Sequence, residues 1–503
     1  MNIENKTVKT FKTPISVNSQ QSVEQEFILP DYYGDISKIL KCSLVPNYDN
    51  VSVSGDKISI SGTCRLLLVY YGEDKKLYSY SNDIAYTKMM QCSGIEAGDC
   101  VSVNVKLLSE NCRALGPKRI EVRGMVHLNA LVYGVKAINI VSDITDNNIE
   151  IRSTSDYVFI PSCCVQRDFS LEENAELSIK GSTCEVIHTE DRLIISEMKS
   201  IDNKVYMKGE LFVEVIYIDD EGDTGKRSFS LPVSEVVDAY EACEDDMCCL
   251  TDVYTVVNTV IKDSVSNEKA LSLTAKINFV LVAGKQCELS CISDLYSTGD
   301  GINTVFEEVE FRKEMKINEK TFTVNYETDV FEEDIAGIGD SFIENLQIIT
   351  EKKENGFVLV VNANCNALLN LSEGMHSFIT RKCNEEYVPE INENVENILI
   401  TDAKILSVMA IRQADNKIKF TFDVCVKYHE AIKCKVKTLS KISPCEAESF
   451  AKEKGIVLYY AKKNESLWEI GKENRASQSF IRSINGIEED ILTEDRVLVF
   501  PEL

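Results

Sequence analysis

The stretch from Asp56 to Asp74 reads DKISISGTCRLLLVYYGED and decides the fold class. Apolar and polar residues alternate along it, which is the period of a β-strand with one buried face. Its end, GED, combines glycine with acidic residues and is typical of a hairpin turn. The stretch therefore predicts a long strand that turns back into a hairpin.

The same pattern returns 147 residues later, as NKVYMKGELFVEVIYIDDEG at residues 203–222. In this alignment Gly62 of the first copy matches Gly209 of the second. A fainter third copy, FVLVVNANCNALLNLSEG at residues 357–374, has Ala363 in the place of the glycine. Glycine inside a strand predicts a β-bulge or the close approach of another backbone.

Each copy is followed by a second alternating run, so the repeat extends beyond one strand. These runs are RIEVRGMVHLNALVYG (119–134), LSLTAKINFVLVAG (271–284) and KIKFTFDVCVKYHE (417–430). The sequence predicts a mainly β protein with β-rich repeats at residues 1–150, 151–300 and 301–447, the third diverged, and a small domain at 455–503. Repetition multiplies contact surface and does not build one cleft, which favours a binding array over an enzyme.

Composition excludes several classes of ligand. The chain has 81 acidic and 54 basic residues and a formal net charge of −27. Such a surface repels phosphate backbones and anionic membranes, so we expect no nucleic-acid partner. No apolar stretch approaches the length of a membrane span, and the start MNIENKTVKTFKTPISV lacks a secretory apolar run. We expect a cytoplasmic protein.

The residues that would indicate catalysis or metal binding are scattered. The four histidines occupy unrelated places in the copies, and there is no GxSxG, HExxH or CxxC pattern. We therefore expect no enzyme, no catalytic residues, no metal site and no cofactor. The 18 cysteines of a cytosolic chain favour packed, reduced thiols, with crosslinking late in the life of the protein as the functional alternative.

The final fifty residues differ from the rest of the chain. IVLYYA at Ile456–Ala461 predicts a strand, and Ser466 with Glu469 three positions later is typical of a helix start. Ser477 can cap a second helix, and NG at 485–486 favours a left-handed helix end. RVLVFP at 496–501 predicts a closing strand, which gives the order strand–helix–helix–strand.

This order, with its tyrosine-rich first strand, the SLW-I segment, the NG turn and the final VL–P strand, resembles a LysM domain. The resemblance implies a binding site in the loop before the first helix and the loop after the second. The expected partner-binding residues are Asn464, Glu465, Ser466, Leu467, Trp468, Asn485, Gly486 and Ile487. Asn464-Glu465 replaces the usual Gly-Asp, which changes the backbone angles open to the loop and shifts the expectation from sugar toward protein.

The repeats and the terminal module together resemble the SipL-like spore coat morphogenetic proteins, a family of SPOCS-domain proteins of spore-forming clostridia. FILPDYYGDISKIL at Phe27–Leu40 resembles the P-D-x-x-D-I-x-K-I-L signature of the SPOCS domain. The resemblance implies a scaffold for spore coat assembly, made in the mother-cell cytoplasm and recruited to the forespore surface. Its partners would be the coat morphogenetic ATPase, stage IV sporulation protein A, and other coat proteins.

Two questions stay open at the level of sequence. The LysM-like module could instead bind a glycan such as peptidoglycan or another N-acetylglucosamine chain. Trp468, the single tryptophan of the chain, fits either an exposed anchor for a partner or a core residue of the module.

Overall fold

The structure is a computed structural model of the chain. It describes residues 2–501 except 178–183, 220–222, 264–268, 300, 315–316, 332–334, 354–355, 373–374, 390–396, 414–415, 432 and 446–455. Strands make up most of the described residues, which confirms the prediction of a mainly β fold. The boundary expected between 447 and 455 lies outside the described residues, and the division into domains stays a prediction.

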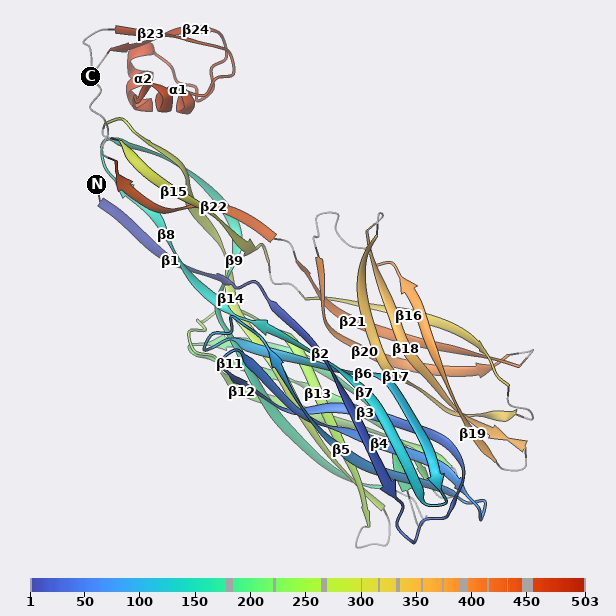
Figure 1. The fold of residues 1–503 in the computed structure, drawn as a ribbon. Helices are drawn as coiled ribbons and strands as arrows, with labels where there is room; N and C mark the ends of the chain where they lie inside the picture. The colour runs from blue at the N-terminus through green and yellow to red at the C-terminus, as the bar shows by residue number, and fades with distance from the viewer. Residues whose placement is uncertain are drawn as a thin grey trace.

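Three β-sandwiches form the broad end of the molecule (Figure 1). Each contains two antiparallel sheets whose inner faces meet in one apolar core. The first contains β2 (Ile15–Ile28), β3 (Ile36–Ser54), β4 (Lys57–Gly72), β5 (Leu77–Gln91), β6 (Cys100–Gly116) and β7 (Arg119–Tyr133). Its sheets have the strand orders β3-β4-β5 and β2-β7-β6.

The second and third sandwiches repeat this order. The second contains β9 (Ile149–Leu177), β10 (Cys184–Ile201), β11 (Lys204–Asp219), β12 (Thr224–Asp238), β13 (Met247–Asp263) and β14 (Lys269–Ser297). The third contains β16 (Ile317–Asp329), β17 (Ile335–Lys353), β18 (Gly356–Leu371), β19 (His376–Tyr387), β20 (Asn397–Arg412) and β21 (Lys417–Ala431). The strands β4, β11 and β18, which hold the three copies of the opening pattern, are each central in their sheet.

The glycine of the repeat marks a bulge in the neighbouring strand. A Cβ on Gly62 would lie 2.1 Å from the carbonyl oxygen of Asn47, and one on Gly209 would lie 2.2 Å from that of Ile194. The register of the partner strand shifts by one residue opposite both glycines, and it shifts again opposite Ala363. The predicted bulge and the predicted close approach both occur.

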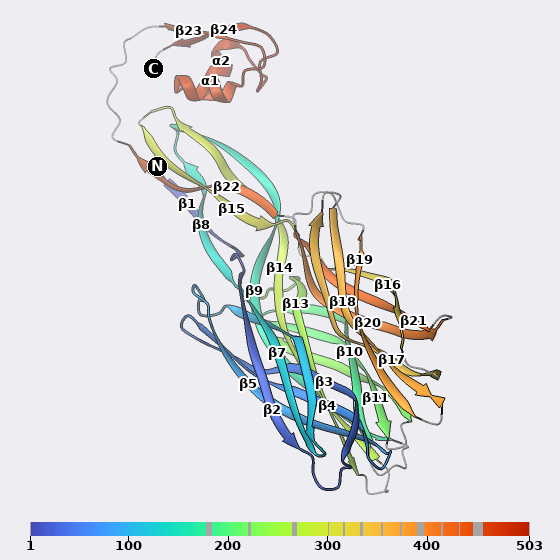
Figure 2. The same cartoon turned by 45° about the vertical axis from the view of Figure 1, so that its right-hand side comes forward.

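A stalk rises from the sandwiches as three paired ribbons (Figure 2). It is built from β1 (Asn2–Phe11) with β8 (Val135–Thr145), β15 (Ile302–Arg312) with β22 (Lys433–Pro444), and the outer halves of β9 and β14. The ribbons share a core to which each contributes, with Val8, Val158 and Phe311 among its members. Here a unit means one sandwich together with the strand segments that flank it in the chain. Because a two-stranded ribbon is only marginally stable alone, the shared core explains why the first and last segments of every unit assemble together.

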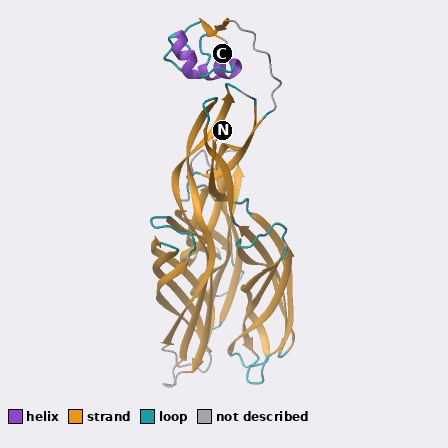
Figure 3. Cartoon of the chain, turned by 90° about the vertical axis from the view of Figure 1, so that its left-hand side faces the viewer, coloured by secondary structure: helices purple, strands orange, loops and turns teal. Residues whose placement is uncertain are grey.

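The two helices of the described residues lie at the far end of the stalk (Figure 3). They belong to a C-terminal module of β23 (Ile456–Ala461), α1 (Leu467–Asn474), α2 (Gln478–Asn485) and β24 (Arg496–Pro501), in the predicted order. Strands β23 and β24 pair antiparallel. Neither helix is long and apolar enough to cross a membrane.

Candidate functional site

The two helices of the C-terminal module begin and end where the sequence predicts. The Ser466 hydroxyl accepts a hydrogen bond from the Trp468 backbone N–H, and Ser477 caps α2 in the same way through Phe480. Arg475 caps the C-terminal end of α1 and Gly486 that of α2, both with left-handed backbone angles. These caps let two helices of eight residues each turn sharply within a small module.

One small core holds the module together. It consists of apolar side chains from both strands, both helices and the loop before β24: Ala461, Leu467, Ile470, Ala476, Ile481, Ile487, Leu492, Leu498 and Phe500. On α2, Ile481 is fully buried, whereas Ile484 is 41% exposed. Of these two side chains, Ile481 alone belongs to the core of the module.

The two loops expected to form the binding site are tied to each other. The Asn464 N–H donates to the Leu492 carbonyl oxygen at 2.8 Å, and the Leu492 N–H donates to that of Glu465 at 2.9 Å. Asn464 has φ 72°, a left-handed conformation that asparagine tolerates better than most residues. Glycine also reaches this conformation, and the expected shift from sugar toward protein at Asn464-Glu465 stays a prediction.

The expected site residues divide into surface and support. Asn464 and Gly486 are exposed, and Glu465 is half-buried. Ser466 is committed to the helix cap, and the Asn485 side chain forms hydrogen bonds with the backbone of Val499. Leu467 and Ile487 are buried in the core of the module, so both support the loops and neither offers a side chain to a partner.

Trp468 lies against the tip of the stalk. Its side chain is held at residues 294–296 of β14, where the indole N–H donates to the Asp294 carboxylate at 2.8 Å. The ring packs edge-to-face on Tyr296, with 5.0 Å between the ring centroids. Lys472, one turn later on α1, forms an ion pair with Asp294 at 2.7 Å, and the Tyr296 hydroxyl donates to the Ala476 carbonyl oxygen at 2.9 Å. Trp468 is consequently only 5% exposed. We call these five residues the stalk contact.

A bulge in β14 presents the stalk side of this contact. The register between β14 and β9 shifts between Ile292 and Asp294. Asp294 and Tyr296, two residues apart, then project from one face, while Leu295 enters the stalk core. Sequence reasoning missed both residues, because nothing local to the segment indicates a contact about 175 residues away along the chain.

The electrostatics of the stalk contact depend on the Asp294 carboxylate. Partial burial by itself would raise its pKa, but the hydrogen bonds from Lys472 and Trp468 outweigh that effect and lower the pKa of Asp294 below its ordinary value. Asp294 is therefore ionised at neutral pH and holds both α1 side chains.

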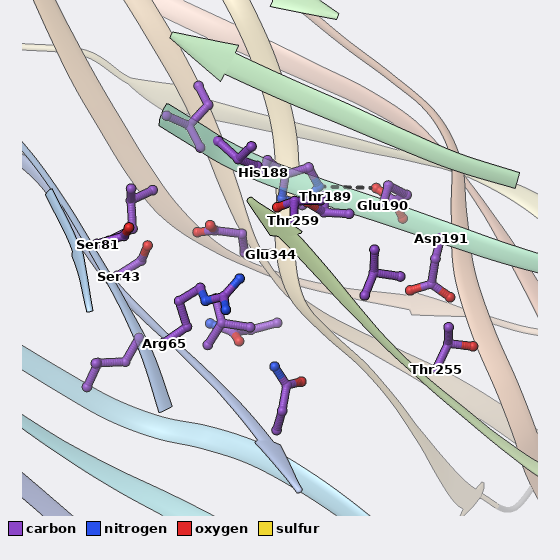
Figure 4. A pocket seen from close by; sticks show the side chains of 18 of the residues that line it. Ser43, Arg65, Ser81, His188, Thr189, Glu190, Asp191, Thr255, Thr259 and Glu344 are labelled. Atoms are coloured by element: carbon purple, nitrogen blue, oxygen red, sulfur yellow. Dashed lines mark hydrogen bonds and ion pairs between the residues drawn. The ribbon is translucent and has the colours of Figure 1, made fainter. Parts of the chain in front are cut away.

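A second feature is a cavity of about 710 Å³ between the three sandwiches. Figure 4 shows polar side chains from all three units around it, with Arg65 and Ser43 from the first, His188 and Glu190 from the second, and Glu344 from the third. The lining comes from segments far apart in the sequence, so no local motif could have indicated it.

Charges beside the cavity are paired across units. Lys404 of the third unit contacts Asp191 of the second at 2.7 Å. Burial opposes the charge of Lys404, but Asp191 and Asp402 raise its pKa. The paired charges thus join the units together.

Within the described residues no group of three or more histidine, cysteine or acidic side chains is placed to hold a metal ion.

Comparison with protein families finds a match in two segments of the chain. Residues 35–115 and 184–261 match the family model described as SipL, SPOCS domain. The first segment spans β3–β6 and the second spans β10–β13. The comparison with curated proteins finds no match. The chain is therefore similar to the SPOCS domain in two equivalent parts of its first and second units, about a third of its length.

Proposed function

We propose that the protein is a non-enzymatic scaffold for endospore coat assembly, which docks through its LysM-like module to the coat morphogenetic ATPase, stage IV sporulation protein A, at the forespore surface. The two SPOCS-like segments support the link to sporulation. Three sandwiches fused to one stalk support a scaffold role, because they offer repeated surfaces in fixed positions.

The stalk contact is the observation that carries the docking role. Trp468 and Lys472 of α1 are both held by the single carboxylate of Asp294, whose side chain is still 24% exposed. Partly exposed ion pairs contribute little to stability, so the bonds of α1 to Asp294 can be exchanged for bonds to another molecule. A partner that offers a carboxylate and an aromatic ring can replace Asp294 and Tyr296 with equivalent groups.

The docking surface then consists of Trp468 and Lys472, once released, and the neighbouring loop at Asn464–Glu465. Gly486 contributes backbone from the second loop. Because Trp468 serves both the stalk and the partner, the two compete for it. Weakening the stalk contact should therefore strengthen docking, whereas removing the indole should weaken docking.

Binding of purified coat ATPase to variants of the full chain tests this proposal. Trp468→Ala should weaken binding at least ten-fold, since aromatic anchors dominate interfaces, and Asp294→Ala should strengthen it. Tyr460→Ala is the matched control, because Tyr460 is 74% exposed and lies next in the strand to Tyr459, which packs on the module core. Equal affinities for the native chain and Trp468→Ala would refute docking through this surface.

Glycan binding is a second candidate, favoured by one observation. Asn464 has φ 72°, a left-handed conformation that is also open to glycine, so the exchange of glycine for asparagine does not by itself exclude a sugar ligand. Retention of the full chain on purified peptidoglycan, lost in Trp468→Ala, would support this candidate and count against docking to the ATPase.

A further inference from the structure

The cysteines are not dispersed evenly through the cores. Six of the 18 lie in three pairs whose thiols contact each other: Cys42 with Cys112, Cys100 with Cys164, and Cys365 with Cys383. The first and third pairs each lie within one sandwich. The second pair joins the first sandwich to β9, which starts the second unit.

The geometry of Cys100 and Cys164 brings two sulfur atoms together across that junction. Their Sγ atoms are 3.8 Å apart, and the Cys100 thiol donates to the Cys164 carbonyl oxygen at 3.6 Å. Beside them the Val101 N–H donates to Oε1 of Gln166 at 2.9 Å, which fixes the start of β6 on β9. Because a disulfide bond is about 2.05 Å long, the two sulfur atoms need to approach by less than 2 Å or so.

We propose that Cys100 and Cys164 are a site of oxidative crosslinking, at which hydrogen peroxide converts the two thiols into a disulfide between the first and second units. One thiolate attacks the peroxide, the O–O bond breaks, and a sulfenic acid and hydroxide form. The second thiol then attacks the sulfenic sulfur, the S–S bond forms, the S–O bond breaks, and the thiol proton leaves with the hydroxide as water. The two thiol protons leave in two molecules of water, so the peroxide supplies both oxidising equivalents.

The pair also favours the Cys100 thiolate, with which this reaction begins. The hydrogen bond from Cys164 lowers the pKa of Cys100, against the effect of burial. A solitary buried thiol behaves differently, since burial raises the pKa of Cys64 to about 12. Cys64 therefore provides a matched control within the same sandwich.

The crosslink would fix one sandwich on the next. The residues are 64 apart in sequence, and closing a loop of this length restricts the unfolded chain strongly. Oxidation should raise the thermal midpoint of the full chain by about 4 °C. This inference does not depend on the identity of the docking partner.

The test treats the reduced full chain with hydrogen peroxide, blocks remaining thiols with an alkylating agent, and maps peptides by mass spectrometry without reduction. We expect a peptide pair linked through Cys100 and Cys164, and the rise in thermal midpoint with it. Cys100→Ser should abolish both, and leave Cys164 alkylated, whereas Cys64→Ser should leave both unchanged.

Cys163 needs a control of its own, because it lies beside Cys164 in the same peptide. Adjacent residues of a strand point to opposite faces, and Cys163 packs in the core of the second sandwich. The link should therefore persist in Cys163→Ser. A Cys163–Cys164 disulfide, or oxidation of Cys164 to the sulfinic acid with Cys100 still reduced, would overturn the proposal.

Discussion

Replacing Asp294 by alanine should release Trp468 from the stalk. The change removes a charge-assisted hydrogen bond from the indole N–H, worth about 1.5 kcal/mol, and a partly exposed ion pair with Lys472, worth about 0.5 kcal/mol. The ratio of modules that contact the stalk to modules released from it should then fall roughly 30-fold, the equivalent of about 2 kcal/mol. Tyr296 and its bond to Ala476 remain, so some contact persists.

Fluorescence measures this release directly, because Trp468 is the single tryptophan of the chain. In Asp294→Ala the emission should shift to longer wavelength and quenching by acrylamide should increase. Asp294→Lys, which opposes Lys472 with a second cation, should release the module fully. Glu288→Ala removes an exposed carboxylate from the same strand and should change nothing. Unchanged emission and quenching in both Asp294 variants would refute the stalk contact.

Three further predictions concern pH, the bulge and the junction between units. The pKa of Asp294 is lowered while the stalk contact is formed. The contact should therefore be complete above the ordinary carboxylate pKa of about 3.9, and it should be lost as the pH falls below that value. A pH titration of Trp468 emission checks this, and Asp294→Ala should show no such transition. Gly62→Ala should lower the free energy of unfolding, measured by urea titration, by about 2–3 kcal/mol, since the new Cβ would meet backbone. Gly116→Ala is the control and should leave the free energy of unfolding unchanged, because the atom nearest to its Cβ would be 4.0 Å away. Lys404→Met should lower the free energy of unfolding by about 3 kcal/mol, because it leaves Asp191 unpaired. In the double variant with Asp191→Leu, the same urea titration should show that most of this loss is recovered.

The parts of the fold that follow from local pattern could be predicted from the sequence. The alternation of apolar and polar residues along β4 and β11 indicates strands with one buried face. The recurrence of this pattern after 147 residues indicates a repeated unit. Gly62 predicted a bulge because only a residue without a Cβ fits against the Asn47 carbonyl. Helix caps at Ser466 and Ser477 were equally local, since the cap and the backbone N–H it satisfies are neighbours in sequence.

The stalk and the stalk contact could not be predicted, because both depend on distant segments. β1 pairs with β8 and β15 with β22, each across more than 120 residues, and the three ribbons become stable only by burying one another. The position of Trp468 was open for the same reason, since its partner Asp294 lies in another unit. The ligand preference of the loop at Asn464, which has φ 72°, stays a prediction, because it depends on a partner and not on the local sequence.

Recovery of the coat ATPase with the chain from sporulating cells tests the central claim most directly. The full chain should co-purify with stage IV sporulation protein A, and a chain lacking residues 450–503 should not, although its sandwiches and stalk remain. Equal recovery of the ATPase with both chains would contradict docking through the C-terminal module.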